Sequence, residues 1–292
     1  MRIPAQGPLD TLFKRLVDYI EPDYPEWPSM IQPASTAQIK QLYEAAHLGE
    51  IGRDFPPAYR IFLEHMGADD GGLITEWDGF GLDISVDKLI EFYQDLFCPD
   101  GFSDSWQPDP HWLCFLHHWT DCELYFDLHQ GENPTIYLGQ EKPEYFSSCF
   151  ENYLFQKAFY QIQKRLYSAQ VDYGTSQLQM EFWLRRQAGV RDVTASFSDK
   201  RQPWLSDTPG NSLGLLEQIL EPFGLQKLWF SDAANYIGVC GDVSVIAHGA
   251  NSFWAVFLGA PYQKAAEMAH RVKQALYLDR KVLFSLPYRK RN

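Results

Sequence analysis

The stretch FPPAYRIFLEHMGADDGG, residues 55–72, decides how the first half of the chain folds. Its apolar residues recur at the spacing of one helical face, and its prolines stand where a first helical turn tolerates them. We therefore predict a helix that has Asp54 as its N-cap and ends at Gly67. Its expected inward residues are Tyr59, Phe62, Leu63 and Met66. The glycines after it predict a loop over residues 68–72 that exposes two carboxylates.

Further helices are expected on both sides of this stretch. Residues 9–20 have the apolar spacing of an amphipathic helix, and the three prolines of residues 21–28 predict an extended connector after it. Residues 35–38, Ser-Thr-Ala-Gln, have the form of a capping box, which predicts a helix that begins there. A second such box, Ser-Cys-Phe-Glu at residues 148–151, predicts the start of a long helix.

Between these helices lie short runs with the composition of strands, interrupted by one more helical pattern over residues 86–97. The expected strands cover residues 73–77, 80–84, 112–116, 123–128 and 135–138. Helices packed on a small antiparallel sheet make an α+β domain, which we place at residues 30–170. Residues 1–29 are then an N-terminal extension that consists of a helix and a proline-rich connector.

Residues 171–292 predict a second α+β domain with an antiparallel meander. One helix is expected to end before Pro222, and another covers residues 262–278. Glycine-containing turns separate several of the expected strands. These strands cover residues 177–184, 225–230, 236–240, 243–248, 253–258 and 282–286.

Charge is distributed unevenly between the two halves. The chain has a formal net charge of -13, and residues 1–170 hold 11 lysines and arginines against 27 aspartates and glutamates, whereas residues 171–292 hold 14 against 11. A concentrated negative field repels phosphate backbones and anionic membranes and attracts basic proteins. We therefore expect no direct nucleic-acid binding by the N-terminal half, no membrane partner, and a positively charged macromolecular partner.

The compartment that the sequence favours is the cytoplasm. Charged residues interrupt the apolar residues of segment 9–20, unlike in a signal peptide, and no stretch approaches the length of a membrane span. The five cysteines are few, odd in number and scattered, which is typical of reduced thiols rather than of a disulfide framework.

The N-terminal half resembles the SUKH superfamily, also called the SMI/KNR-like family. The resemblance covers roughly residues 30–167. It is carried by Pro-Ala-Ser at residues 33–35, by the Pro-x-x-Tyr-x-x-Phe-Leu helix and the glycine-rich loop of residues 55–72, and by residues 147–154 at the closing helix. It implies a cytoplasmic immunity protein of the bacterial toxin-immunity type, which binds and blocks a cognate toxin. The resemblance also implies that such toxins are often nucleases or other nucleic-acid-modifying enzymes, whose active sites are basic because they must hold phosphates.

Acidic residues near aromatic ones are the expected partner-binding residues. Carboxylates pair with arginine and lysine, and tryptophans are common anchors of interfaces. Three of the acids share parity around one expected strand and so are predicted to line one face. The full set is Asp69, Asp70, Trp77, Asp78, Asp83, Asp100, Asp104, Trp106, Trp119, Asp121, Glu123 and Asp127.

Two other functions stay open. Fungal proteins of the resembled family act as intracellular regulatory scaffolds, which is the first alternative. The second is a metal-assisted hydrolase that uses two thiols and two imidazoles within nine residues. Its residues would be Cys114, His117, His118 and Cys122. We predict that no catalytic residue, metal or cofactor is needed, and a homo-oligomer is compatible with the sequence.

Overall fold

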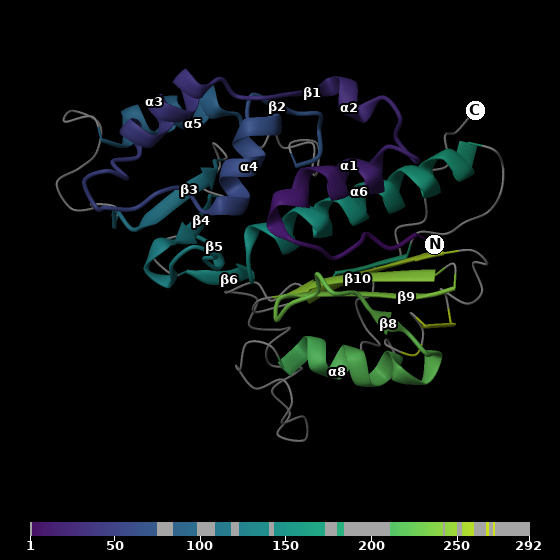
Figure 1. Ribbon diagram of the computed structural model, residues 1–292. Helices are drawn as coiled ribbons and strands as arrows, with labels where there is room; N and C mark the ends of the chain where they lie inside the picture. The colour runs from purple at the N-terminus through teal and green to yellow at the C-terminus, as the bar shows by residue number, and fades with distance from the viewer. Residues whose placement is uncertain are drawn as a thin grey trace, which may run out of the picture. The chain divides into compact units, whose positions relative to one another are not determined.

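The computed structural model describes residues 2–74, 84–97, 109–117, 123–139, 143–172, 180–183, 211–241, 243–249 and 253–259, together with Glu267, Met268 and Arg271. The chain divides into an N-terminal unit, Arg2–Ile162, and a C-terminal unit, Gln163–Asn292. The division falls within helix α6 (Phe150–Asp172). Each unit combines helices with an antiparallel sheet (Figure 1), which confirms the predicted α+β class.

The N-terminal unit contains two antiparallel sheets among its helices. The helical elements are η1 (Leu9–Thr11), α1 (Leu12–Ile20), α2 (Trp27–Met30), α3 (Thr36–Ala45), α4 (Pro57–Met66), α5 (Val86–Leu96), η2 (Leu128–Gln130) and the first part of α6. Strands β1 (Ile31–Gln32) and β2 (Asp69–Asp70) pair with each other. Strands β3 (Trp112–Leu116), β4 (Leu124–Asp127), β5 (Ile136–Leu138) and β6 (Glu144–Ser147) form a second sheet in that order.

An aromatic core joins α4 and α6 to one face of the four-stranded sheet. Tyr59 of α4 is fully buried, and its ring centroid lies 5.3 Å from that of Phe126 in β4 and 5.3 Å from that of Phe150 in α6. Phe115 of β3 stacks on Phe126 at 4.2 Å. The helix predicted from residues 55–72 is thus the element that covers this sheet face, and its four predicted inward residues are all buried.

The predicted helix starts have different outcomes. The capping box of α3 is confirmed, because the Ser35 hydroxyl accepts from the backbone N–H of Gln38 at 3.2 Å and the Gln38 side chain accepts from the backbone N–H of Ser35 at 2.9 Å. Asp54 as N-cap of α4 is wrong. The N-cap is Pro56, and the Asp54 carboxylate instead accepts from the backbone N–H of Phe55 and pairs with Arg60 at 3.2 Å.

The proline-rich segment is also less extended than predicted. Residues 21–26 are mostly turns, and the short helix α2 follows, with Pro28 in its first turn, where a missing N–H is tolerated. A strand at residues 73–77 is not seen in its described part, because Leu73 and Ile74 form a turn. Most of the strand expected at residues 80–84 lies outside the described residues.

The C-terminal unit contains the predicted antiparallel meander. Strands β8 (Gln226–Lys227), β9 (Asn235–Cys240), β10 (Val243–Gly249) and β11 (Phe253–Gly259) pair consecutively, and β7 (Met180–Trp183) pairs with β11. Gly241 has a φ of 62° in the turn that joins β9 to β10, as a tight hairpin requires. Helix α8 (Asn211–Leu220) packs on β9 and β10 through buried Leu216 and Leu220, and η4 (Glu221–Phe223) follows it. The helix expected at residues 262–278 and the strand expected at 282–286 fall almost wholly outside the described residues.

Candidate protein-binding surface

The face of the four-stranded sheet that points away from the aromatic core presents a row of aromatic side chains. Tyr125 of β4 is the cross-strand partner of Tyr137 in β5, and Tyr137 is the partner of Tyr145 in β6. Trp112 of β3 lies 5.2 Å from Tyr137 and 6.4 Å from Tyr125, measured between ring centroids. We call these four residues, Trp112, Tyr125, Tyr137 and Tyr145, the aromatic row.

Strand alternation explains this arrangement. Side chains of consecutive strand residues point to opposite faces, so Phe126 faces the core while Tyr125 and Asp127 face the other way. Trp112, Tyr137 and Tyr145 are half-buried, whereas Tyr125 is buried. Aromatic rings that are only partly covered on a sheet face are a common feature of protein interfaces.

Two of the predicted acidic residues flank the aromatic row. Glu123 directly precedes β4 and Asp127 ends it, and their side chains are 20% and 16% exposed. Burial raises the pKa of the Cys114 thiol and of the Tyr125 hydroxyl, and the nearby Glu123 carboxylate adds to both shifts. Strand alternation places Asp127 on the same face as Tyr125, and Glu123 lies near Tyr125, while the role of both acids as contact residues stays a prediction.

The sequence segment that contributes most of this face carries charge of one sign. Between Lys88 and Lys142 the chain has no lysine or arginine, but it has ten aspartates and glutamates. The described part of this segment includes β3, β4 and β5 and therefore most of the aromatic row. This segment of the chain therefore offers carboxylates, and no lysine or arginine, to a partner.

The comparison with protein families identifies the segment that builds this face. Residues 33–156 match the SMI1 / KNR4 family (SUKH-1). The chain contains a SUKH-1 domain. No curated protein and no solved structure matches it. The match begins at residue 33, so η1, α1 and α2 precede the SUKH-1 domain and pack within the same unit.

The glycine-rich loop of the SUKH-1 domain is only partly exposed. Asp69 is exposed, and its carboxylate accepts from the backbone N–H of Gly71 at 2.9 Å. Asp70 is 2% exposed, and its two oxygens accept from the backbone N–H groups of Gly72 and Ile74 at 2.9 and 2.7 Å. The predicted exposure of Asp70 is therefore wrong, because this carboxylate satisfies buried backbone donors. Asp69 stays a predicted contact residue.

The remaining predicted contact residues lie outside the described residues. They belong to segments 75–83, 98–108 and 118–122, and so their roles stay predictions. They are Trp77, Asp78, Asp83, Asp100, Asp104, Trp106, Trp119 and Asp121.

The predicted thiol–imidazole cluster is weakened by the position of Cys114. This residue is 1% exposed, its thiol donates to the carbonyl oxygen of Leu116 at 3.4 Å, and burial raises its pKa well above the ordinary value. Packing in the interior therefore accounts for Cys114 without a ligand role. Nδ1 of His117 lies 3.5 Å from Glu123. His118 and Cys122 lie outside the described residues.

A different group of metal-binding side chains in the SUKH-1 domain was not anticipated. Asp109, His111 and His129 each place one potential ligand atom within 4.8 Å of the others. The signal was present in the sequence as two Asp-x-His motifs, at residues 109–111 and 127–129. Neither this group nor the aromatic row was predicted, because both arrangements depend on the register between strands. Among the described helices, none combines the length and the apolar character needed to cross a membrane.

Proposed function

We propose that this protein is a cytoplasmic immunity protein that binds a cognate bacterial toxin and blocks its active site. The observation that carries the proposal is that three of the four residues of the aromatic row, Trp112, Tyr125 and Tyr137, lie in a segment that is acidic and contains no lysine or arginine. The match to the SUKH-1 family supports this function. A toxin that cleaves or modifies nucleic acid is the favoured target, because its active site must be basic to hold phosphates.

The aromatic row and the acids have separate tasks in the proposed complex. Large aromatic side chains contribute much of the affinity of an interface when a partner covers them, and Trp112 is the strongest candidate for this role. The acidic residues accelerate encounter with a basic partner and disfavour neutral or acidic ones. Glu123 is the acidic residue that we expect to contribute most, because it is partly exposed and lies beside Tyr125 of the aromatic row.

We propose that the protein acts by occlusion, with no chemistry of its own. A thiol nucleophile must be accessible as a thiolate, and Cys114 is neither exposed nor inclined to ionise. Cys149 is buried as well, and burial raises its pKa. The free thiols of Cys114, Cys149 and Cys240 are in keeping with a reducing cytoplasm.

An intracellular regulatory scaffold is the second candidate. The match to the SMI1 / KNR4 family favours a scaffold, because the fungal proteins of the resembled family act as scaffolds. A scaffold would use the same surface for several weak partners, whereas an immunity protein would bind one partner with nanomolar or lower Kd. The number of partners and their affinity therefore distinguish the two functions.

Growth rescue tests the proposal directly. The toxin encoded beside the gene is expressed from an inducible promoter, alone or together with this protein. We expect the wild-type protein and a Glu44→Lys variant, altered at an exposed position of α3, to restore growth. Glu123→Lys and Trp112→Ala are expected to fail, provided that circular dichroism shows both to be folded. Absence of rescue by the wild type, or full rescue by Glu123→Lys and Trp112→Ala, would count against the proposal.

A further inference from the structure

Two copies of an Asp-x-His motif meet at one end of the four-stranded sheet. Asp109 and His111 directly precede β3, and Asp127 and His129 stand at the end of β4. Because β3 and β4 are antiparallel, with Trp112 opposite Asp127, the start of one strand lies beside the end of the other. The backbone N–H of Leu128 donates to the carbonyl oxygen of His111 at 2.8 Å and extends this pairing past the strands.

Each motif has the same local geometry. The Asp109 carboxylate accepts from the backbone N–H of His111 at 2.9 Å and lies 3.3 Å from its Nδ1. The Asp127 carboxylate accepts from the backbone N–H of His129 at 3.1 Å and lies 3.0 Å from its Nδ1. Each aspartate therefore holds the loop of its motif and orients the imidazole two residues later.

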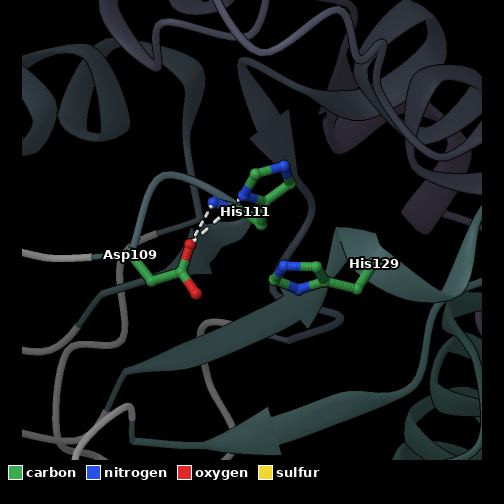
Figure 2. Close-up of side chains that lie close together, drawn as sticks. All are labelled: Asp109, His111 and His129. Carbon is green, nitrogen blue, oxygen red and sulfur yellow. Dashed lines mark hydrogen bonds and ion pairs between the residues drawn. The ribbon is translucent and has the colours of Figure 1, made fainter.

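The two motifs bring their imidazoles together. The rings of His111 and His129 are stacked, with centroids 4.3 Å apart and an interplanar angle of 26°. Figure 2 shows the Asp109 carboxylate beside His111, with His129 approaching from the neighbouring segment. One ligand atom from each of these three residues lies within 4.8 Å of the other two.

Asp127 and Gln130 form hydrogen bonds that hold the imidazole of His129 in place. While Asp127 Oδ1 faces Nδ1 of His129, its Oδ2 accepts from the Gln130 side chain at 2.8 Å. A carboxylate that accepts from one imidazole nitrogen fixes the tautomer in which the other nitrogen carries a lone pair. His129 is thereby prepared to bind a metal through Nε2. Such carboxylate–histidine pairs are a regular feature of metal sites.

We propose that Asp109, His111 and His129 bind a divalent transition metal of the zinc type. Two imidazoles and one carboxylate suit zinc, copper and nickel, whereas calcium and magnesium prefer ligands that are all oxygen. Three protein ligands leave coordination positions for water. The side chains are 48%, 30% and 54% exposed, so an ion can reach them directly from solvent. This inference does not depend on the proposed toxin-binding function.

Calorimetric titration of the full chain with zinc chloride tests the site. The protein is first treated with a chelator and carries no purification tag. We expect one zinc ion per chain, loss of that binding in His111→Ala and His129→Ala, and a loss of affinity of about 10- to 100-fold in Asp127→Asn. His65→Ala is the matched control, because His65 is exposed and stacks on Phe13 in α1. It should bind zinc like the wild type.

Two further measurements separate this site from the thiol–imidazole cluster and from misfolding. With Co²⁺ as the probe, the proposed ligands give no sulfur-to-cobalt charge-transfer band, and Cys114→Ser leaves binding unchanged. Zinc should raise the Tm of the wild type and of Cys114→Ser, but not of the folded His111→Ala and His129→Ala variants. The proposal is overturned if no stoichiometric zinc binds, if binding survives both histidine substitutions, or if it is lost with Cys114→Ser.

Discussion

At the scale of single residues, the glycine-rich loop is held by contacts from residues that precede the family match at residue 33. The indole Nε1 of Trp27 donates to the carbonyl oxygen of Asp70 at 3.0 Å, and Ile31 pairs with Asp70 across β1 and β2. Gly71 follows with a φ of 62°, and a Cβ at this position would lie 2.8 Å from two atoms of the Trp27 ring. The extension therefore restricts which residue can occupy position 71.

Substitution of Gly71 should lower the free energy of unfolding by more than backbone strain alone explains. Gly52 has a φ of 64°, but a Cβ there would meet nothing within 4 Å. We expect Gly52→Ala to lower the free energy of unfolding by about 1 kcal/mol, as an alanine at positive φ does. Gly71→Ala should lower it by clearly more, because Trp27 must also move. Urea unfolding measures both, and equal losses would show that Trp27 does not constrain the loop.

The buried tyrosines of the core predict a loss of stability at alkaline pH. Burial raises the pKa of Tyr59 and of Tyr93 well above the ordinary value of about 10. Above pH 10 the unfolded chain releases tyrosine protons that the folded chain keeps, so the free energy of unfolding falls as pH rises. Each such tyrosine contributes a slope of about 1.4 kcal/mol per pH unit.

Tyr59→Phe isolates one of these contributions. The variant removes the ionisable hydroxyl while it retains the ring that packs on Phe126 and Phe150. Between pH 10 and 11 its free energy of unfolding should fall by about 1 kcal/mol less than that of the wild type, and the difference in slope should approach about 1.4 kcal/mol per pH unit once the unfolded tyrosine is fully ionised. Below pH 9 the difference between the two proteins should not depend on pH. Parallel curves above pH 10 would contradict the burial of an un-ionised Tyr59.

At the scale of elements, one buried ion pair fastens α1 to α6. The Arg15 guanidinium lies 2.7 Å from the Glu151 carboxylate and is 8% exposed. It also donates to the carbonyl oxygens of Ala5 and Pro8 and to the Thr11 hydroxyl. Arg15 thus adds an ion pair with α6 to the contacts that α1 makes with α4.

Removal of this side chain should destabilise the whole N-terminal unit. Arg15→Ala removes the cation that pairs with the Glu151 carboxylate, 23% exposed, and the hydrogen bonds that the guanidinium donates to Ala5, Pro8 and Thr11, so we expect a loss of about 3 kcal/mol. Lys14→Ala on the same helix breaks only an exposed pair with Asp18 and should cost less than about 0.5 kcal/mol. Thermal or urea unfolding provides the comparison. Similar small losses for both variants would mean that α1 is not fastened by Arg15.

Elements with a local signal could be predicted from the sequence, and those fixed by distant contacts could not. The α3 capping box and the inward face of α4 are encoded by neighbouring residues. Asp54 is an exception, because its partners Phe55 and Arg60 are close in sequence. At Asp70 the distant contacts are made by the backbone, which pairs with β1 and accepts from Trp27. The short strand β6 (Glu144–Ser147) was not predicted.

The candidate surface could also be predicted only where the signal lies within one strand. Parity along one strand placed Glu123 and Asp127 on a common face. The aromatic row and the Asp109, His111 and His129 group instead require the register between strands. That register is set by the packing of Phe115 and Phe126 under α4, which no single segment of sequence specifies.

At the scale of the whole molecule, charge is concentrated in one half of the chain. The proposed partner is basic, so attraction over distances longer than contact should accelerate association. Salt screens this attraction, and the Debye length falls from about 10 Å at 0.1 M to about 3 Å at 1 M. We expect the association rate constant with the toxin to fall steeply between these conditions, while the dissociation rate constant changes little. An association rate constant that does not change with salt would indicate that the acidic residues contribute to solubility and not to association.

The most direct test of the central claim is the affinity of the purified protein for the toxin encoded beside its gene, measured for matched charge reversals. Biosensor titration of wild type, Glu123→Lys and Glu44→Lys compares an acid beside the aromatic row with an exposed acid on α3. The account predicts nanomolar or lower Kd for the wild type and Glu44→Lys. For Glu123→Lys it predicts a Kd at least tenfold higher, which corresponds to a loss of about 1.4 kcal/mol of binding free energy. Equal Kd values for all three proteins would contradict the assignment of this sheet face as the binding surface.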